Sequence, residues 1–433
     1  MSTTAPAGGT TTAAAVLARC AELDAFTATP GRLERTHLTP EHAAANALVA
    51  TWMQEAGLRT WQDAAGNLCG RVEGREPGLP ALVLGSHLDT VPDAGSFDGM
   101  LGVVMAVAVV ERLAERCATL PFALELVAFS DEEGTRFGTA LLGSKAYSGQ
   151  WDPDWWDLRD RDGVTLHRAY LDFGLDPRRN GEAARQPEEL VGYLEAHIEQ
   201  GPYLEEADVS LGYVTTVAGA RRFRLSVHGE ARHAGGTPYE RRRDAVVGAG
   251  VVVTTIERMA RERDVIATVG RIEAHPGAVN VIAGRVDLSL DLRAPLDATR
   301  DGAWDEILAV LDAACTERGL RLEVQETHRA AAAPCAGWLQ QAVVDGIRST
   351  GDADPTALWS RAGHDAMALA TVTDVGMLFV RCFDGISHHP GEDVREVDVA
   401  AGVDAFEQAV LAAARAYEAG ATDAPAPAAG LGR

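Results

Sequence analysis

The stretch Gly85-Ser-His-Leu-Asp-Thr-Val-Pro-Asp-Ala-Gly-Ser-Phe-Asp98-Gly99 governs how the rest of the chain is interpreted. It follows the apolar run 81–84, which lacks the alternation of a half-exposed strand and predicts a buried strand of a parallel sheet. His87 and Asp89 come at the end of that strand, where side chains two residues apart point the same way. The carboxylate would hold the imidazole tautomer while the other ring nitrogen binds a metal. A hydrogen-bonded structural pair is the alternative.

Two further strand ends carry polar groups. The apolar run 122–129 ends in Ser130-Asp-Glu-Glu-Gly134, and the short strand 194–196 leads to His197. Ligands gather at the carboxyl ends of strands in open α/β sheets, and a cation would explain adjacent carboxylates that otherwise repel. Glu133 would ligate the metal and Glu132 would act as a general base with a raised pKa, with a solvated acidic turn as the alternative. His197 adds a donor that a two-metal site needs.

Composition bounds the class of protein. A chain of 433 residues is long enough for two domains, and its net charge of −24 argues against nucleic acid or an anionic membrane as a partner. The longest apolar runs, 101–110 and 245–256, fall short of the roughly twenty residues that cross a bilayer. Six cysteines without Cys-x-x-Cys spacing predict free thiols in a reducing cytoplasm.

The second half of the chain changes character from about Leu211. Its pattern predicts the order β-α-β-β-α-β of a ferredoxin-like module, inserted at about 213–330. The predicted elements are strands at 223–228, 265–272, 281–293 and 320–325 and helices at 243–261 and 302–318. The chain then returns to the first domain with a helix at 338–349 and a strand at 375–380, which leads to a further strand-end histidine, His388.

Seven separated motifs resemble one family. They are GSHLDTVPDAGSFDG, FSDEEGTRFG, HIEQGP, ARHAGGTP, NVIAGRVDLSLDLRAP, SRAGHDAMA and GISHHP, in an order similar to that of the amidase/hydantoinase/carbamoylase branch of the di-metal aminoacylase and carboxypeptidase-like hydrolases. The resemblance covers about 13–417. It implies an α/β fold: a catalytic di-metal domain with a mixed, mostly parallel sheet, and an inserted ferredoxin-like α+β lid and dimerisation domain. The expected bounds are 15–212 and 331–419 for the catalytic domain and 213–330 for the lid, with disordered tails at 1–14 and 420–433.

The resemblance also implies a ligand set for two divalent ions per subunit, Mn²⁺ or Zn²⁺. In it, one metal has His87 as its terminal ligand, Asp98 bridges, Glu133 binds the second metal, and His197 and His388 complete the set. His388 is preferred to His389 because it directly follows the serine. Imidazole and carboxylate ligands without thiolate suit either ion.

The remaining roles are implied in the same way. Glu132 is expected to be the general base, and Asp89 the partner of His87. His233 resembles the family's oxyanion donor, usually supplied by the lid of the partner subunit, and Arg293 its bidentate carboxylate clamp. Expected weaker substrate contacts are Gln200, Asn280 and Gly363. Two departures from the family pattern are Arg361, where a small residue is usual, and Gly236, which replaces a commoner threonine.

The branch hydrolyses carbamoyl or ureido C–N bonds. Stretches such as Arg35-Thr-His-Leu-Thr-Pro resemble allantoate amidohydrolases, and this resemblance implies allantoate as the substrate, which would give ureidoglycine (or ureidoglycolate), ammonia and carbon dioxide. An N-carbamoyl-L-amino acid or N-carbamoyl-β-alanine is the alternative substrate. A dinuclear dipeptidase or aminoacylase and a non-catalytic binding protein are further alternatives. We expect a cytoplasmic homodimer that associates through the lid and acts on a small ureido or carbamoyl carboxylate in purine catabolism.

Overall fold

The computed structural model describes residues 11–422 and divides them into two compact units. Unit 1 contains the described residues up to Thr215 together with Pro334–Leu358 and the chain from Ala362 onward, and unit 2 contains Thr216–Ala333 and Trp359–Arg361. The inserted module was expected at 213–330. Of the expected tails, residues 1–10 and 423–433 lie outside the described part of the chain.

Unit 1 is built on a nine-stranded sheet with the order β1-β2-β4-β3-β5-β16-β6-β14, in which β15 also pairs with β6. The central strands β4, β3, β5 and β16 are parallel, whereas β2 and β6 run antiparallel to their neighbours β4 and β16. The strands are β1 (Arg59–Gln62), β2 (Leu68–Val72), β3 (Ala81–His87), β4 (Ala123–Phe129), β5 (Leu190–Ile198), β6 (Leu211–Val217), β14 (Ala333–Pro334), β15 (Thr356–Ser360) and β16 (Val375–Val380). The predicted mixed sheet is therefore confirmed, with parallel strands at its centre and antiparallel pairs on both sides of them.

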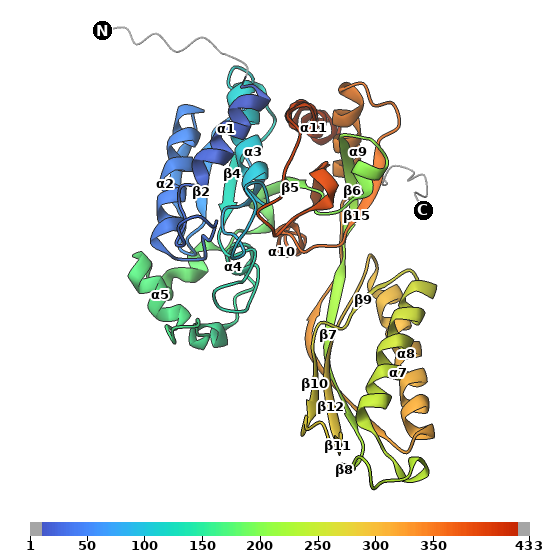
Figure 1. The fold of residues 1–433 in the computed structure, drawn as a ribbon. Coiled ribbons are helices and arrows are strands. Elements are labelled where there is room, and N and C mark those ends of the chain that lie inside the picture. Colours follow the sequence, from blue (N-terminus) through green and yellow to red (C-terminus); the bar gives the residue numbers. More distant parts are fainter. Residues whose placement is uncertain (1–10, 423–433) are drawn as a thin grey trace, which may run out of the picture. The chain divides into compact units, whose positions relative to one another are not determined.

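Helices surround this sheet (Figure 1). The α-helices of unit 1 are α1 (Ala13–Leu23), α2 (Pro40–Glu55), α3 (Met100–Arg112), α4 (Leu142–Tyr147), α5 (Leu166–Phe173), α6 (Tyr203–Glu206), α9 (Gly337–Ser349), α10 (Ala366–Leu369) and α11 (Glu396–Glu418). Short 3₁₀ helices are η1 (Cys117–Thr119), η2 (Pro153–Asp157), η3 (Pro177–Ala183), η4 (Pro187–Glu189) and η6 (Phe383–Gly385). Because α1 begins at Ala13, the expected tail 1–14 was placed two residues too far along the chain.

Strand β3 and helix α3 form the centre of unit 1. All seven residues of β3 are buried, as expected for a parallel strand covered on both faces. In α3, every residue from Met100 to Val110 is buried, because the helix is apolar all round and packs against β3 and β5. The loop between β3 and α3 is thus held at both ends by the core, which fixes the position of Asp98.

Unit 2 has the predicted order β-α-β-β-α-β when β9 with β10 and β11 with β12 are each counted as one divided strand and the two-residue β8 is set aside. Its antiparallel sheet has the order β10-β12-β7-β13, with β9 also paired to β12, and α7 and α8 lie along one face (Figure 1). Phe223 stacks on Trp304 at 3.9 Å between ring centroids in the core beneath these helices. The elements are β7 (Gly219–His228), β8 (Arg232–His233), η5 (Tyr239–Arg241), α7 (Ala245–Glu262), β9 (Ile266–Thr268), β10 (Ile272–His275), β11 (Val281–Ile282), β12 (Arg285–Ala294), α8 (Asp297–Glu317) and β13 (Arg321–Ala330).

Two strands of unit 2 are divided where single strands were expected, so the predicted strands 265–272 and 281–293 are wrong as continuous elements. The first becomes β9 and β10, which pair with different parts of β12, and between them Ser289 accepts a hydrogen bond from the backbone N–H of Arg271. The second breaks after Ile282, because the carbonyl groups of Ala283 and Gly284 bind backbone N–H groups of other segments.

Two expectations drawn from composition agree with the structure. All six cysteines are free and buried, as predicted. Among residues 11–422, none of the helices has the length and apolar character required to span a bilayer.

Candidate functional site

The side chains that the sequence singled out in unit 1 come together at the carboxyl ends of its parallel strands. His87 ends β3, Glu132 and Glu133 follow β4, His197 lies at the end of β5, and the loop after β16 carries His388. All four strands are neighbours in the sheet. The edge at which they end is where an open α/β sheet places its ligands.

Asp98 lies at the centre of this group and uses its two oxygens differently. Oδ1 is 3.2 Å from His197 Nε2 and 3.7 Å from His87 Nε2, whereas Oδ2 is 3.0 Å from His388 Nε2. His388 Nε2 is also 3.5 Å from Glu133 Oε1. One carboxylate therefore joins two sets of donor atoms, His87–Asp98–His197 and Asp98–Glu133–His388, each close enough to hold one cation.

The two buried imidazoles are oriented by backbone carbonyl groups. His87 Nδ1 donates to the carbonyl oxygen of Asp89 at 3.0 Å, and His197 Nδ1 donates to that of Ile198 at 2.9 Å. These bonds place a proton on Nδ1 and leave the lone pair of Nε2 directed at Asp98. The expected contact between the Asp89 carboxylate and His87 is thus made by the Asp89 carbonyl instead, and the carboxylate oxygen is 3.7 Å from the ring.

The Asp89 carboxylate has a different task. Its two oxygens accept the backbone N–H groups of Glu132 and Glu133, at 3.0 and 3.1 Å, and so fix the turn that follows β4. Glu132 Oε2 lies 4.0 Å from His87 Nε2. Burial, together with the charges of neighbouring carboxylates, raises the pKa of Glu132 well above its usual value despite the opposing effect of His87. Burial and the charge of Asp98 raise the pKa of Glu133 to about 7.

The histidines respond to the same acidic surroundings. Burial lowers the pKa of His87 and of His197, but the contact with Asp98 outweighs it, and both values lie above the usual one. The contact with Asp98 also raises the pKa of His388 to about 9 against partial burial. Contacts with these three rings hold the pKa of Asp98 well below its usual range although burial acts the other way. The carboxylates of this site are thus close together and buried, an arrangement that disfavours their charged forms unless positive charge lies nearby.

These residues fit a pair of divalent cations. His197 Nε2 is buried and has no hydrogen-bond partner among the described residues, although it points at the carboxylate of Asp98. A buried acceptor nitrogen beside a carboxylate is repelled unless a cation or a proton lies between them. Imidazole nitrogen and carboxylate oxygen without thiolate form the donor set that Zn²⁺ and Mn²⁺ accept.

Two expected substrate contacts of unit 1 lie beside these residues. The Gln200 side-chain amide donates to Asp98 Oδ2 at 2.8 Å, so in this structure it orients the central carboxylate, while its own Oε1 is buried without a partner in the described chain. Gly363 lies next to Glu132, because a Cβ built on it would be 3.8 Å from Glu132 Oε1. His389, the neighbour of His388, instead accepts the backbone N–H of Gly391.

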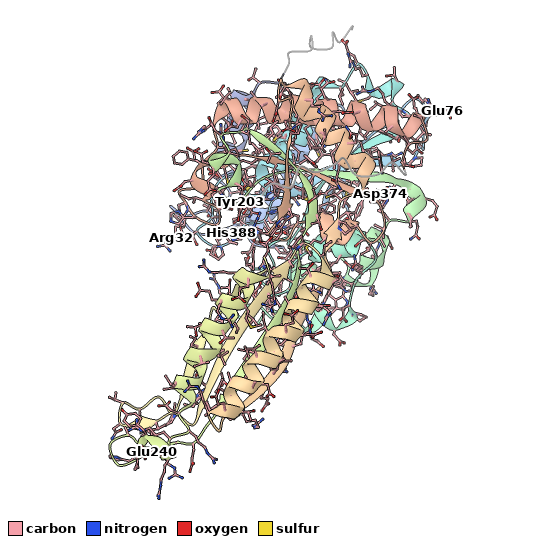
Figure 2. The ribbon with its side chains drawn as sticks, turned by 90° about the vertical axis from the view of Figure 1, so that its right-hand side faces the viewer. Arg32, Glu76, Tyr203, Glu240, Asp374 and His388 are labelled. Atoms are coloured by element: carbon pink, nitrogen blue, oxygen red, sulfur yellow. The ribbon has the colours of Figure 1, made fainter. Side chains whose placement is uncertain are left out.

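The expected site residues of unit 2 fall at opposite ends of that unit. His233 lies in β8, which pairs with β11 directly after Asn280, and both residues are exposed. This end of the sheet is marked by β8 and β11 in Figure 1, and Glu240 lies near its tip in Figure 2. Arg293 pairs with Ile266 at the other end of β12. The strand rise puts about 27 Å between Arg293 and Arg285, the first residue of β12. Unit 2 therefore does not bring His233 and Arg293 together.

Arg293 is held by residues of its own unit. Its Nε and Nη2 donate to the two carboxylate oxygens of Asp291 at 2.7 and 3.3 Å, and its Nη1 donates to the carbonyl of Arg361 at 2.8 Å. The guanidinium has five N–H donors, so two of them have no partner among the described residues. The side chain of Arg361 stacks over Trp359 at 4.1 Å, which anchors the carbonyl that Arg293 binds.

The sequence interpretation missed several buried polar residues around the site. Glu195 accepts hydrogen bonds from Ser86 and from the backbone of Ala366, and it lies close to His197 and His364. Glu392 accepts hydrogen bonds from Phe97, Asp98 and Ser387. The sequence contained an indication of each. Glu195 lies two residues before His197 in a buried strand, and Glu392 follows the motif that contains His388.

Comparison with known proteins agrees with this arrangement. The family model for peptidase family M20/M25/M40 matches residues 83–412. An N-carbamoyl-L-amino acid amidohydrolase of Geobacillus stearothermophilus is 40% identical over 381 residues, covering 88% of this chain and 93% of that protein. A probable allantoate deiminase of Oryza sativa subsp. japonica is 37% identical over 420 residues, covering 89% and 85%. The crystal structure of an amidase of the hydantoinase/carbamoylase family from Burkholderia multivorans superposes with a TM-score of 0.85 at 32% identity, covering 93% of this chain and 98% of that one.

The family match and the named relatives define a hydrolase, as the motifs predicted. More particularly, the chain belongs to peptidase family M20/M25/M40, and its likeness to the hydantoinase/carbamoylase amidases confirms the expected branch.

Proposed function

We propose that the protein binds two divalent ions, Mn²⁺ or Zn²⁺, and hydrolyses a ureido or carbamoyl C–N bond of a small carboxylate. The observation that carries this proposal is the placement of Asp98, whose two oxygens face two separate donor sets. One ion would be held by His87, Asp98 and His197, and the other by Asp98, Glu133 and His388. When bound, such ions polarise a carbonyl group and acidify water.

The side chains would perform the remaining chemistry. Glu132, buried and next to His87, takes a proton from the attacking water and later delivers it to the leaving nitrogen. Its raised pKa suits a group that must both accept and return a proton near neutral pH. Asp89 keeps Glu132 in place through the backbone, and Arg293 would bind a substrate carboxylate with the two N–H groups that have no partner in the described chain.

Within this reaction, we favour allantoate as the substrate, giving ureidoglycine, ammonia and carbon dioxide. The sequence motifs and the 37% identity to a probable allantoate deiminase support it. An N-carbamoyl-L-amino acid is the second candidate, because a relative with that activity in its name is 40% identical. Both substrates present a carboxylate and a ureido group, so the described donors do not distinguish between them.

The experiment is ammonia release from purified, Mn²⁺-loaded protein. Allantoate, N-carbamoyl-L-methionine and N-carbamoyl-β-alanine are compared side by side, with Glu132→Gln as the control. We expect preference for allantoate and a loss of roughly 10²- to 10⁴-fold in the variant. Preference for a carbamoyl amino acid would replace the substrate and keep the reaction, whereas no ammonia from any of the three would reject the proposal.

A further inference from the structure

Two loops that are distant in sequence supply donors to the same proposed ion. Asp98 lies between β3 and α3, and His388 lies between β16 and α11. His388 has a backbone φ of 55° and a side chain that is 48% exposed, so the core does little to hold it. The 3.0 Å approach of its Nε2 to Asp98 therefore needs another connection between the loops.

Glu392 makes that connection. Its Oε1 accepts the backbone N–H groups of Phe97 and Asp98, at 2.8 and 3.0 Å, and its Oε2 is 2.9 Å from the hydroxyl of Ser387, the residue before His388. The same hydroxyl is 2.9 Å from Asp98 Oδ2. Because a hydroxyl has one proton, it donates to one of these carboxylates at a time. One buried side chain thus binds the backbone of the first loop and the side chain of the second.

The surrounding chain is shaped to admit this carboxylate. Glu392 is 6% exposed, and a Cβ built on Gly95 would lie 2.3 Å from its Cβ and 2.4 Å from its Oε1. Any side chain at position 95 would displace Glu392 from the N–H groups of Phe97 and Asp98. Gly95 does not have a positive φ, so its backbone conformation does not require glycine. The contact with Glu392 does, because it leaves no room for a side chain at position 95.

We propose that Glu392 is a positioning residue that sets the separation between Asp98 and His388 and thereby the affinity for the ion shared by Asp98, Glu133 and His388. The inference rests on the proposed pair of ions. It also predicts an asymmetry. The other ion shares Asp98, but its two further donors, His87 and His197, belong to buried strands and have no contact with Glu392 in the described part of the chain. Their ion should depend on Glu392 much less.

The test is a titration of metal-free protein with Mn²⁺ alone, in which unbound Mn²⁺ is counted by electron paramagnetic resonance. Wild-type protein should bind two ions. Glu392→Ala should weaken one of them by about 10- to 100-fold, the usual effect of removing a group that orients a ligand, and leave the other within about threefold. Gly95→Ala, which keeps the carboxylate but displaces it, should behave in the same way.

Two further variants separate positioning from other effects. In Glu392→Gln, the amide oxygen accepts both backbone N–H groups and the amide N–H₂ donates to Ser387, so binding of both ions should be restored to within about threefold. Asp63→Ala is the matched control, because the Asp63 carboxylate also accepts two backbone N–H groups and one side-chain donor, none from a metal-ligand candidate. It should leave both affinities unchanged.

Each outcome decides a separate question. Two ions of unchanged affinity in Glu392→Ala and Gly95→Ala would overturn the role of Glu392, as would an equal loss of both ions. If Glu392→Ala does not fold, Gly95→Ala gives the decision. Wild-type protein that binds fewer than two ions would instead reject the proposed ion pair, and wild-type protein that binds two but releases no ammonia would reject only the proposed reaction.

Discussion

Two buried histidines away from the site, His37 and His42, are kept neutral by the fold. Both are fully buried, and neither ring nitrogen of His37 has a hydrogen-bond partner in the described chain. Burial lowers the pKa of His42 to about 3, with a further contribution from Arg35, and burial and the charge of His42 and Arg136 lower that of His37 well below its usual value. Their rings pack among aromatic side chains, which leaves a protonated imidazole without a partner.

These values predict acid sensitivity. A histidine whose folded-state pKa is depressed does not change the pH dependence of the unfolding free energy above about pH 6.5. Below that pH the unfolded chain binds a proton that the folded chain does not, so the unfolding free energy falls as the pH falls. His37→Phe removes one such group from an aromatic environment. Between pH 7.5 and pH 5, the variant should lose about 2 kcal/mol less unfolding free energy than the wild type.

Urea denaturation at the two pH values measures this difference. His167→Phe is the control, because His167 is exposed and its substitution should leave the pH dependence as in the wild type. An identical pH dependence of stability in His37→Phe and the wild type would contradict the prediction.

At the scale of single residues, sequence reasoning selected the candidate side chains because they follow apolar strands. His87, Glu132, Glu133 and His197 each come at or just after such a run, and parallel strands bring their ends together. Contacts made across the chain could not be predicted in this way. The link from Glu392 to Asp98 joins residues 294 positions apart, and no local pattern encodes it.

At the scale of elements, the start of α3 shapes the site. Gly99 precedes the helix with a φ of 77°, and a Cβ built on it would lie 2.4–2.5 Å from three atoms of the His87 ring. The glycine therefore serves both the turn into the helix and the space that the imidazole occupies. A side chain here would shift His87 away from Asp98.

Gly99→Ala should accordingly displace His87 and weaken Mn²⁺ binding, in addition to a cost of about 1–3 kcal/mol for a side chain in this sparsely populated backbone conformation (φ 77°, ψ −50°). Gly78→Ala is a matched control, because Gly78 has a φ of 79° and no atom within 4 Å of a built Cβ. It should lose stability by a similar amount and bind Mn²⁺ as the wild type does. Equal Mn²⁺ affinity of both variants, measured by titration, would show that His87 adapts to the added methyl group.

Elements of the inserted unit show what the hydrophobic pattern leaves undetermined. Alternation correctly predicts that most residues of 281–293 are in strands. The strand is nevertheless interrupted at Ala283 and Gly284, whose carbonyl groups accept the backbone N–H groups of Ala245 and Gly229. Such a break depends on the partner of a carbonyl, which the alternation of side chains does not record. The order of helices and strands was predictable because it follows from the spacing of hydrophobic residues and the length of each segment, without knowledge of hydrogen-bond partners.

At the scale of the whole molecule, the ends of unit 2 bear on the assembly. His233 and Asn280 lie at one end of its sheet and Arg293 at the other, so these residues of one unit 2 cannot surround one small substrate. We propose that the protein is a homodimer in which His233 serves the site of the partner subunit. This arrangement gives each site an oxyanion donor without bringing the two ends of unit 2 together.

Complementation between inactive variants tests this assembly. Glu132→Gln and His233→Ala should each be inactive as homodimers. Mixed under conditions that exchange subunits, they should form dimers in which the site with Glu132 receives an intact His233, and about one quarter of wild-type activity should return. Activity that stays absent after exchange, with mixed dimers present by mass spectrometry, would place His233 in the site of its own chain; a monomer in sedimentation with full activity would exclude the dimer.

The place of β16 in the sheet has a consequence for how the protein is made. This strand lies between β5 and β6, yet among the strands of residues 11–422 it is synthesised last, after the whole of unit 2. Until about residue 380 has left the exit tunnel, β5 and β6 each have an edge without its β16 partner. The backbone groups of these edges remain open to chaperones or to other nascent chains. Unit 2 is almost continuous in sequence and can fold during that interval. Unit 1 therefore remains incomplete for longest during synthesis, although the ribosome begins it first.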